Sequence, residues 1–387
     1  MMKLISHKIF LKHDLLDHPE RAERIRKALK LFPYEQATNG SIYLSKVHTH
    51  RYIDKVEEAS KEAGDGLKFL DAGETYVGKD TYRVACYAVG AAVQAAEYAK
   101  KGKNAFALVR PPGHHAHPDW TNGFCIFNNI GIAAVHLAEK NARVLIIDID
   151  LHRGDGTSEI VQEFNHELGD RMYYFSINQI GVFPGMSLDE GNIRNVYVEP
   201  ETTEDQYIEI LHKEIPALMH KFKPSVIAIS AGSDSFHRDK EMHRERLGCG
   251  LSLTKKTIYA LKKIIHSKPY FAVLEGGYDP DSVVEGVGAF LGVIVKGDEE
   301  KKKPVAKKVK KAKKLQKGTI KKRASPRKRL KKGKAAKKKS VKVKRKKAVK
   351  KKKAKKKRAK PAKKKKAAKK KAKPKKKAVK KKAAKKK

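Results

Sequence analysis

The chain has 387 residues, room for one large or two ordinary domains, and a formal net charge of +48 at pH 7. That charge is uneven, because residues 301–387 hold 53 lysines and arginines and no acidic residue, which leaves 37 basic and 42 acidic side chains in residues 1–300. Three cysteines without paired spacing argue against a disulfide-based scaffold, and no apolar run approaches the ~18–20 residues of a membrane span, so we expect a soluble intracellular protein with no membrane partner.

Helix-like and strand-like segments alternate between about residues 80 and 295. Helices are expected where small apolar residues recur at helical spacing, and strands where short runs are wholly apolar. The predicted order is helix 82–100, strand 105–109, helix 130–138, strand 144–149, strand 172–177, helix 206–222, strand 225–230, helix 253–265 and strand 270–274. Fully apolar strands that alternate with helices indicate an α/β fold, with a parallel sheet covered by helices on both faces.

The character of the sequence changes after Gly297. Residues 301–387 are mostly Lys, Ala, Pro and Val with no aromatic residue, so they cannot bury enough apolar surface to offset chain entropy and charge repulsion. We expect residues 1–297 to form one domain and residues 298–387 to form a disordered polycationic tail. The charge of the tail predicts strong, weakly sequence-selective binding to nucleic acid, in the nucleus of a eukaryote or the nucleoid of a prokaryote. The alternative is a solvated extension without a function.

Four polar clusters follow predicted strands, and ligands of parallel sheets sit beyond such strand ends. Residues 110–115 (RPPGHH) place two imidazoles after a rigid turn; alone, they could be unrelated histidines of a solvated loop. In residues 148–152 (DIDLH), Asp148, Asp150 and His152 share one face if the strand continues that far. Two carboxylates buried together need a compensating cation or hydrogen bonds, which favours a metal site.

The other two clusters are individually weaker. Residues 230–234 (SAGSD) end an apolar strand in a carboxylate, which is often only a helix cap. Residues 274–278 (LEGGY) put a tyrosine on a Gly-Gly turn, where ordinary packing is the usual explanation. The prediction of a metal-dependent active site rests on all four clusters following strands of one sheet.

Taken in order, these motifs resemble the histone deacetylase family, including its bacterial and archaeal members. The resemblance covers roughly residues 1–295, and its motifs are RPPGHH (110–115), GFCIFNN (123–129), DIDLHRGDGT (148–157), FPG (183–185), SAGSD (230–234) and EGGYDP (275–280). It implies the arginase-like α/β fold of that family and hydrolysis of the acetyl amide of acetyl-lysine in proteins. Residues 301–387 are similar to the lysine-rich tails of linker histones.

The resemblance also implies a metal centre. Asp150, His152 and Asp234 match the three metal ligands of the family. Three protein ligands leave a coordination position open for water and the substrate carbonyl, as a catalytic zinc requires. The same ligand set also admits Fe²⁺.

The catalytic groups follow from the same resemblance. His115 matches the general base that later acts as general acid, and His114 matches its mainly electrostatic neighbour. Asp148 and Asp155 match the carboxylates that bind these two histidines. Tyr278 matches the hydroxyl that donates to the developing oxyanion, and losing one such donor typically costs about 3–4 kcal/mol of transition-state stabilisation.

Three further binding regions are implied by the resemblance. An acyl-lysine tunnel and its rim would be formed by Gly123, Phe124, Phe183, Leu247 and Glu74. A structural K⁺ would be held by Asp148, Asp150, His152, Ser176 and Ile177. Arg24 matches an arginine at the inner end of the pocket, near the acetate exit. For Phe124 and Phe183 the alternative is ordinary core packing.

Departures from the family pattern bear on the choice of substrate. Arg153 and Asn178 stand where relatives usually have other polar residues, and the segment between Asp234 and Leu247 is long, which predicts an enlarged basic rim loop. An acidic residue near position 247 would favour acetylated polyamines, so the apolar Leu247 favours acyl-lysine. The alternatives are a deacetylase of polyamines or other small acetylamides, and a nucleic-acid-compacting protein with an inactive core.

Overall fold

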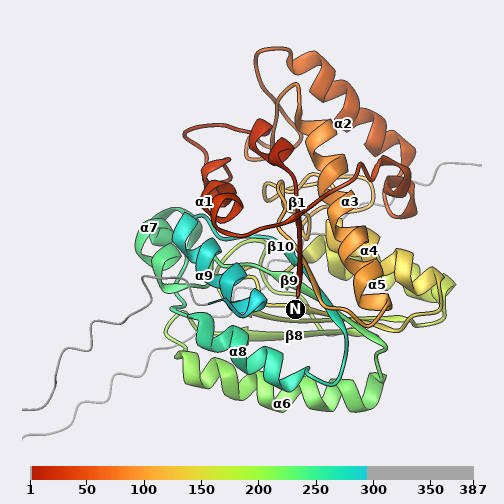
Figure 1. Cartoon of the computed structure of the whole chain (residues 1–387), viewed down its shortest axis with the longest axis vertical. Coiled ribbons are helices and arrows are strands. Elements are labelled where there is room, and N and C mark those ends of the chain that lie inside the picture. Colours follow the sequence, from red (N-terminus) through yellow and green to blue (C-terminus); the bar gives the residue numbers. More distant parts are fainter. Residues whose placement is uncertain (1, 294–387) are drawn as a thin grey trace, which may run out of the picture. The chain divides into compact units, whose positions relative to one another are not determined.

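The computed structural model describes residues 2–293, and the predicted tail (298–387) lies outside the described residues. Its centre is an eight-stranded sheet in the order β2-β1-β5-β10-β9-β6-β7-β8, in which all neighbouring strands are parallel (Figure 1). The strands are β1 (Lys3–Ser6), β2 (Glu35–Gln36), β5 (Ala105–Ala107), β6 (Val144–Asp148), β7 (Met172–Gln179), β8 (Ile193–Val198), β9 (Val226–Ala231) and β10 (Tyr270–Leu274). A separate antiparallel pair consists of β3 (Lys68–Phe69) and β4 (Tyr76–Val77).

Helices cover both faces of the sheet, which confirms the predicted fold class (Figure 1). One layer contains α3 (Thr81–Lys100), α4 (Asn129–Glu139) and α5 (Asp155–Leu168), with α2 (His50–Ala63) packed outside α3. The other contains α1 (Glu23–Leu31), α6 (Glu204–Phe222), α8 (Lys255–Ile264) and α9 (Pro280–Leu291), with α7 (His237–Leu247) against α9. Two 3₁₀ helices are η1 (Lys8–Lys12) and η2 (Ser41–Lys46). Within residues 2–293, no helix combines the length and apolar character that a bilayer span requires.

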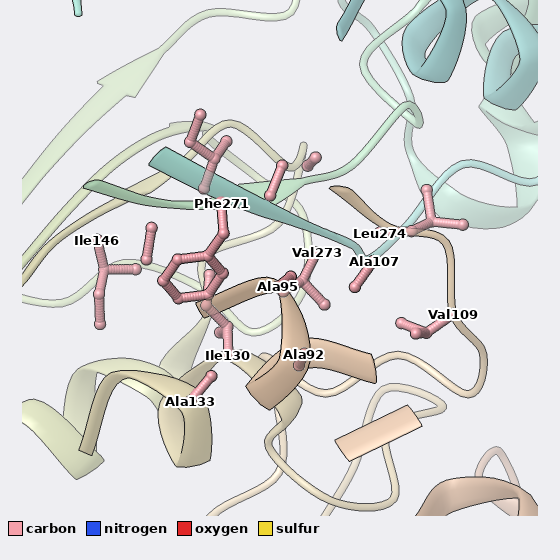
Figure 2. Close-up of a cluster of buried hydrophobic side chains, with 14 of the residues drawn as sticks. Ala92, Ala95, Ala107, Val109, Ile130, Ala133, Ile146, Phe271, Val273 and Leu274 are labelled. Atoms are coloured by element: carbon pink, nitrogen blue, oxygen red, sulfur yellow. The ribbon is translucent and has the colours of Figure 1, made fainter. Parts of the chain in front are cut away.

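The buried core extends over both faces of the sheet, and one part of it lies where α3 and α4 meet the central strands. Ala92 and Ala95 of α3 lie beside the β10 side chains Phe271 and Val273, all fully or almost fully buried (Figure 2). Small side chains let a helix approach a sheet closely, so the alanine-rich sequence of α3 suits this layer. Truncating a buried phenylalanine such as Phe271 to alanine typically costs about 3–5 kcal/mol of stability.

Each of the nine predicted segments overlaps an observed element, but two expectations are corrected. β6 ends at Asp148, so Asp150 and His152 do not continue the strand as the alternation argument assumed. The chain turns there because the Asp148 carboxylate accepts the backbone N–H of Asp150 at 3.1 Å. The predicted rim loop before Leu247 is instead the helix α7, whose sequence contains neither Gly nor Pro.

Candidate metal centre and active site

The predicted clusters meet at one edge of the sheet, beyond the carboxyl ends of β5, β10, β9 and β6. These four strands are neighbours, so the loops that follow them lie side by side. The loop after β6 carries Asp150 and His152, the loop after β9 carries Asp234, and the loop after β10 carries Tyr278. The topology therefore gathers residues that lie more than 100 positions apart in the sequence.

Asp150, His152 and Asp234 converge on one point. Nδ1 of His152 lies 2.9 Å from Oδ2 of Asp234 and 3.2 Å from Oδ1 of Asp150, and all three side chains are buried. Their candidate ligand atoms lie within 4.8 Å of one another. A single imidazole nitrogen can make one hydrogen bond, yet Nδ1 of His152 lies close to two carboxylates. Ligands around a shared cation would be arranged in this way.

Backbone groups fix the two carboxylates. Asp150 accepts the N–H groups of His152 (2.9 Å) and Gly276 (2.7 Å), and Asp234 accepts that of Leu151 (3.0 Å). A Cβ atom at Gly276 would come within 2.5 Å of Asp234 Oδ2 and 2.6 Å of Asp150 Oδ2. Only glycine therefore fits here, and the carboxylate orientations are set by main chain.

The electrostatics of this trio require a positive partner. Burial raises the pKa of Asp234, and repulsion by Asp150 adds to that effect, giving a value of about 6. Burial alone would lower the pKa of His152, but hydrogen bonds to Asp150 and Asp234 outweigh it and raise the pKa to about 10. A divalent cation at the point of convergence would meet the same demand, with His152 bound as the neutral imidazole. One imidazole and two carboxylates suit Zn²⁺, which leaves the cluster compatible with the predicted metal.

A second buried group, formed by His114, Cys125 and Glu275, also has ligand atoms within 4.8 Å of one another. Glu275 already accepts the backbone N–H groups of Gly113 (2.7 Å) and His114 (3.1 Å). Burial, reinforced by Glu275, raises the pKa of the Cys125 thiol well above its usual range. Because metal binding needs the thiolate, the trio of Asp150, His152 and Asp234 is the better metal site.

The tandem histidines sit beside the trio, each on its own carboxylate. His114 Nδ1 lies 3.2 Å from Asp148 Oδ2, His115 Nδ1 lies 2.6 Å from Asp155 Oδ1, and the two rings are 4.0 Å apart. Burial tends to lower the pKa of His114, but the charges of Asp150 and Asp148 outweigh it and raise it well above the usual value. Burial and the charge of His114 lower the pKa of His115 to about 4. His115 is therefore neutral at pH 7, with Nε2 able to accept a proton.

A pocket of about 270 Å³ opens in front of these groups. It is lined by Glu74, His115, Gly123, Phe124, His152, Gly181, Val182, Phe183, Arg246, Leu247, Gly248 and Tyr278. The five residues predicted for the tunnel and its rim are all among them, and their contact with substrate stays a prediction. The rings of Phe124 and Tyr278 meet edge to face at 5.8 Å, which makes a narrow aromatic wall at the inner end.

Tyr278 is held at the base of this pocket. Burial raises the pKa of its hydroxyl well above 10, and the charge of Asp234 adds to that effect, so the hydroxyl keeps its proton. The Arg24 guanidinium lies 4.8 Å from the centre of the tyrosine ring and donates to the carbonyls of Gly277 and Glu275, both at 2.5 Å. Arg24 thus supports the turn that carries Tyr278, and its predicted place on an acetate exit is not tested by these contacts.

The residues predicted for K⁺ are also neighbours. Asp148 of β6 pairs in register with Ser176 of β7. The Ser176 hydroxyl lies 3.1 Å from Asn178 Oδ1 and 3.0 Å from Asn195 Oδ1, so neutral side-chain oxygens gather on the strand next to Asp148. This environment is chemically suitable for a monovalent cation, whose presence stays a prediction.

Several residues of the site were not predicted from the sequence. Tyr174 donates to Asp148 at 2.9 Å, and its position two residues before Ser176 on one strand face could have indicated it. His117 places Nε2 3.3 Å from Asp155 Oδ2 and stacks on Trp120, and no spacing rule predicts that contact. Arg246 enters the pocket lining because α7 ends there.

Comparisons with known proteins agree with this geometry. The family described as the histone deacetylase domain matches residues 12–294. A probable deacetylase of Archaeoglobus fulgidus is 31% identical over 320 residues, covering 75% of this chain and 84% of the relative. Histone deacetylase 10, chloroplastic, of Oryza sativa is 31% identical over 313 residues, covering 72% of this chain and 67% of the relative.

Solved structures show the same fold. The crystal structure of the HDA15 HD domain superposes with a TM-score of 0.67 and 26% identity, covering 75% of this chain and 90% of that one. An acetylpolyamine aminohydrolase from Burkholderia pseudomallei has a TM-score of 0.64 at 24% identity, covering 75% of this chain and 98% of that one. The second likeness supports the fold alone.

Proposed function

The chain belongs to the histone deacetylase family, and we propose that it is a Zn²⁺-dependent hydrolase of acetyl-lysine in proteins. The observation that carries this proposal is a narrow, partly aromatic pocket that ends on the convergent side chains of Asp150, His152 and Asp234. Such a pocket suits the flexible, apolar stem of an acyl-lysine, with the amide delivered to the metal site.

We infer that Asp150, His152 and Asp234 hold the metal. When bound, Zn²⁺ supplies Lewis acidity to the substrate carbonyl and to the attacking water. The ligand set would also accept Fe²⁺. A structural K⁺ at Asp148 and Ser176 would stabilise the loop that carries the first two ligands.

His115 is the proton carrier in the proposed reaction. Its neutral ring accepts a proton at Nε2 from the attacking water, and Asp155 stabilises the imidazolium that results. As the C–N bond breaks, His115 returns this proton to the lysine amine, which leaves as the product. His114 stays bound to Asp148 and contributes mainly through its charge.

Tyr278 stabilises the developing negative charge. Its protonated hydroxyl donates to the substrate oxygen as the carbonyl carbon becomes tetrahedral. Gly123, Phe124 and Phe183 hold the acyl-lysine stem, and Glu74 at the mouth accepts a backbone N–H of the polypeptide. Arg24 lies behind the tyrosine, where acetate would leave.

Two features of the rim favour protein substrates over acetylated polyamines. Leu247 is apolar, and the neighbouring residue in the pocket lining, Arg246, is positively charged. A polyamine carries several positive charges past this rim, whereas a polypeptide need not. The relative activity on acetyl-lysine peptides and acetylated polyamines decides between these substrates.

We propose that residues 1–297 form the catalytic domain and that residues 298–387 bind nucleic acid. The 53 positive charges of residues 301–387 support this assignment. It would place the enzyme on nucleic-acid-associated proteins, in a nucleus or a nucleoid. Filter binding with the full chain and with residues 1–297 tests it, and equal, salt-insensitive affinity of the two for DNA would contradict it.

The decisive test of the chemistry is hydrolysis of an acetyl-lysine peptide by three samples: the intact protein, the protein after chelation, and Asp234→Asn. We expect loss of activity in the last two and recovery of the chelated protein on adding Zn²⁺. Full activity of either would refute the proposed metal centre.

A further inference from the structure

A fully buried carboxylate, Asp239, touches the main chain of the tyrosine at the base of the pocket. Its Oδ1 atom accepts the backbone N–H groups of Tyr278 at 2.6 Å and of Asp279 at 3.1 Å. Asp239 is in the first turn of α7 and has 0% exposure. Burying a carboxyl group is costly unless it is well bonded, so this contact calls for an explanation.

Capping of the following helix does not supply that explanation. α9 begins after Asp279, whose own Oδ1 accepts the N–H groups of Asp281 and Ser282, each at 2.9 Å. The start of the helix is therefore already capped by its N-cap residue. Asp239 also interacts with the Ser282 side chain of α9, but both of its backbone hydrogen bonds are to N–H groups before the helix, and the shorter is to Tyr278 itself.

The position of Asp239 in the chain connects this contact to the metal cluster. It follows the metal ligand Asp234 by five residues, and the intervening segment is fixed by hydrogen bonds from Phe236 N to Ser233 O and from Ser233 N to Gly276 O, both 3.0 Å. One rigid segment therefore presents Asp234 to the metal cluster and Asp239 to the tyrosine backbone. The distance between the two groups is thus set through a short, ordered connection.

Tyr278 has other neighbours, and Arg24 also bonds the Gly277 carbonyl of the same turn, but the backbone N–H of Tyr278 itself is bonded by Asp239. The ring of His243 lies at 5.9 Å and the Arg24 guanidinium at 4.8 Å. Ring contacts of this kind restrict the tilt of an aromatic side chain more than the place of its Cα atom. The preceding residue, Gly277, has a φ of +107°, so the turn alone does not provide a common, stable conformation.

We propose that Asp239 is a positioning residue, which sets the Tyr278 hydroxyl at its working distance from the metal cluster by holding the tyrosine backbone. The inference rests on the proposed function, because it assumes that the Tyr278 hydroxyl stabilises the transition state. Asp239 does not touch the substrate. It acts only through Tyr278, and its loss should change kcat and leave KM nearly unchanged.

A double-mutant cycle tests this inference in the full-length, zinc-loaded protein, with kcat, KM, bound zinc and Tm measured for every variant. Asp239→Leu replaces the acceptor by a somewhat larger apolar side chain, and we expect kcat to fall about 10- to 100-fold, as a displacement of about 1 Å would cause. In a Tyr278→Phe background the same change should lower kcat less than about 3-fold, because the hydroxyl that it misplaces is gone. If the leucine variant does not fold, Asp239→Ala carries the same cycle.

Two matched variants separate positioning from general stability. Asp239→Asn keeps the acceptor oxygen and should restore kcat to within about 3-fold of the wild type. Asp279→Ala also removes two backbone hydrogen bonds at the same helix end but leaves that of Tyr278, so it should lower Tm with kcat within about 3-fold. Equal losses of kcat from Asp239→Leu in both backgrounds, or from Asp279→Ala, would overturn the inference alone. A Tyr278→Phe enzyme with undiminished kcat would overturn the proposed role of the tyrosine and this inference with it.

Discussion

Two regions of the pocket are built differently. The inner wall is formed by His115, His152 and Tyr278 with the carboxylates behind them (Asp150, Asp155 and Asp234), and the rim includes Glu74, Arg246 and Leu247. On the inner wall, the carboxylates of Asp150 and Asp234 accept three backbone N–H groups at 2.7–3.0 Å, so main chain dictates where they point. On the rim, Arg246 reaches the carbonyl of Asp17 through a single 3.3 Å contact, and Glu74 is exposed. The side chains of the inner wall are therefore held by more hydrogen bonds than Glu74 and Arg246 of the rim.

This difference predicts that the inner wall and the rim affect different kinetic parameters. Groups on the inner wall should act on the chemical step and respond strongly to small changes, since a preorganised site loses much when one dipole moves. Groups on the rim should act on substrate choice, with smaller effects that appear mainly in KM.

The largest effect is expected for Asp155→Asn on the inner wall. The carboxylate of Asp155 lies 2.6 Å from His115 Nδ1 and holds the imidazole with Nε2 free. An amide would stabilise the wrong tautomer as readily as the right one, so kcat should fall about 10³- to 10⁴-fold with little change in KM. Steady-state kinetics on an acetyl-lysine peptide measures this, with Glu159→Gln, one contact further out through His117, as the milder control. A loss below 10-fold would mean that the Asp155 carboxylate does not set the tautomer of His115 in the reaction.

The pH dependence provides the next largest contrast. Burial and the charge of His114 lower the pKa of His115 to about 4, so the base stays neutral and competent as the pH falls from 7 to 5. A histidine with an ordinary pKa near 6.5 would lose about 30-fold in activity at pH 5 from protonation, whereas this one should lose little. The measurement is kcat/KM from pH 5 to 8, with bound zinc determined at each pH to correct for metal loss. A midpoint near 6.5 at constant zinc content would contradict the role assigned to His115.

The inner wall could be predicted from the sequence far better than the rim. Asp150, His152, Asp234 and Tyr278 follow strands, and parallel topology brings strand ends together whatever the intervening chain does. The convergence of Asp150 and His152 was nonetheless expected for the wrong reason, because β6 stops at Asp148 and backbone hydrogen bonds orient the two side chains.

The rim and the supporting contacts depend on packing that no local pattern encodes. The segment before Leu247 reads as a charged loop, yet it forms α7 because it packs against α9. The inward turn of Asp239 follows from that packing, since a lone aspartate in a charged stretch is usually exposed. The fold class was predictable for the opposite reason, because wholly apolar segments indicate buried strands from local sequence alone. β1 and β8 are short or partly exposed and were missed.

A charge placed on the rim should change substrate choice and leave the chemical step unchanged. Leu247→Glu introduces a carboxylate into the pocket lining, which attracts the distal ammonium groups of an acetylated polyamine. We expect the ratio of kcat/KM for acetylpolyamine to that for an acetyl-lysine peptide to rise about 10-fold, equivalent to one favourable charge contact of roughly 1.4 kcal/mol. Leu188→Glu is the matched control, because Leu188 is 88% exposed and does not line the pocket. A similar shift in the control would show that net charge, and not the rim position, is responsible.

The smallest effect should come from Glu74, whose carboxylate is expected to accept a backbone N–H of a polypeptide substrate. The side chain lines the mouth of the pocket and is exposed, so replacing it by Gln keeps an acceptor and loses only the benefit of charge in a well-solvated place. KM for an acetyl-lysine peptide should rise about 3- to 5-fold with kcat unchanged, as for a weakened hydrogen bond at an exposed site. Apart from its scissile amide, an acetylated alkylamine has no N–H of a polypeptide backbone, and it has no second charge, so its KM should not respond to Glu74→Gln. If KM rises equally for both substrates, Glu74 affects the mouth of the pocket without binding the peptide backbone. Glu74 would then not belong to the residues of the rim that select the substrate.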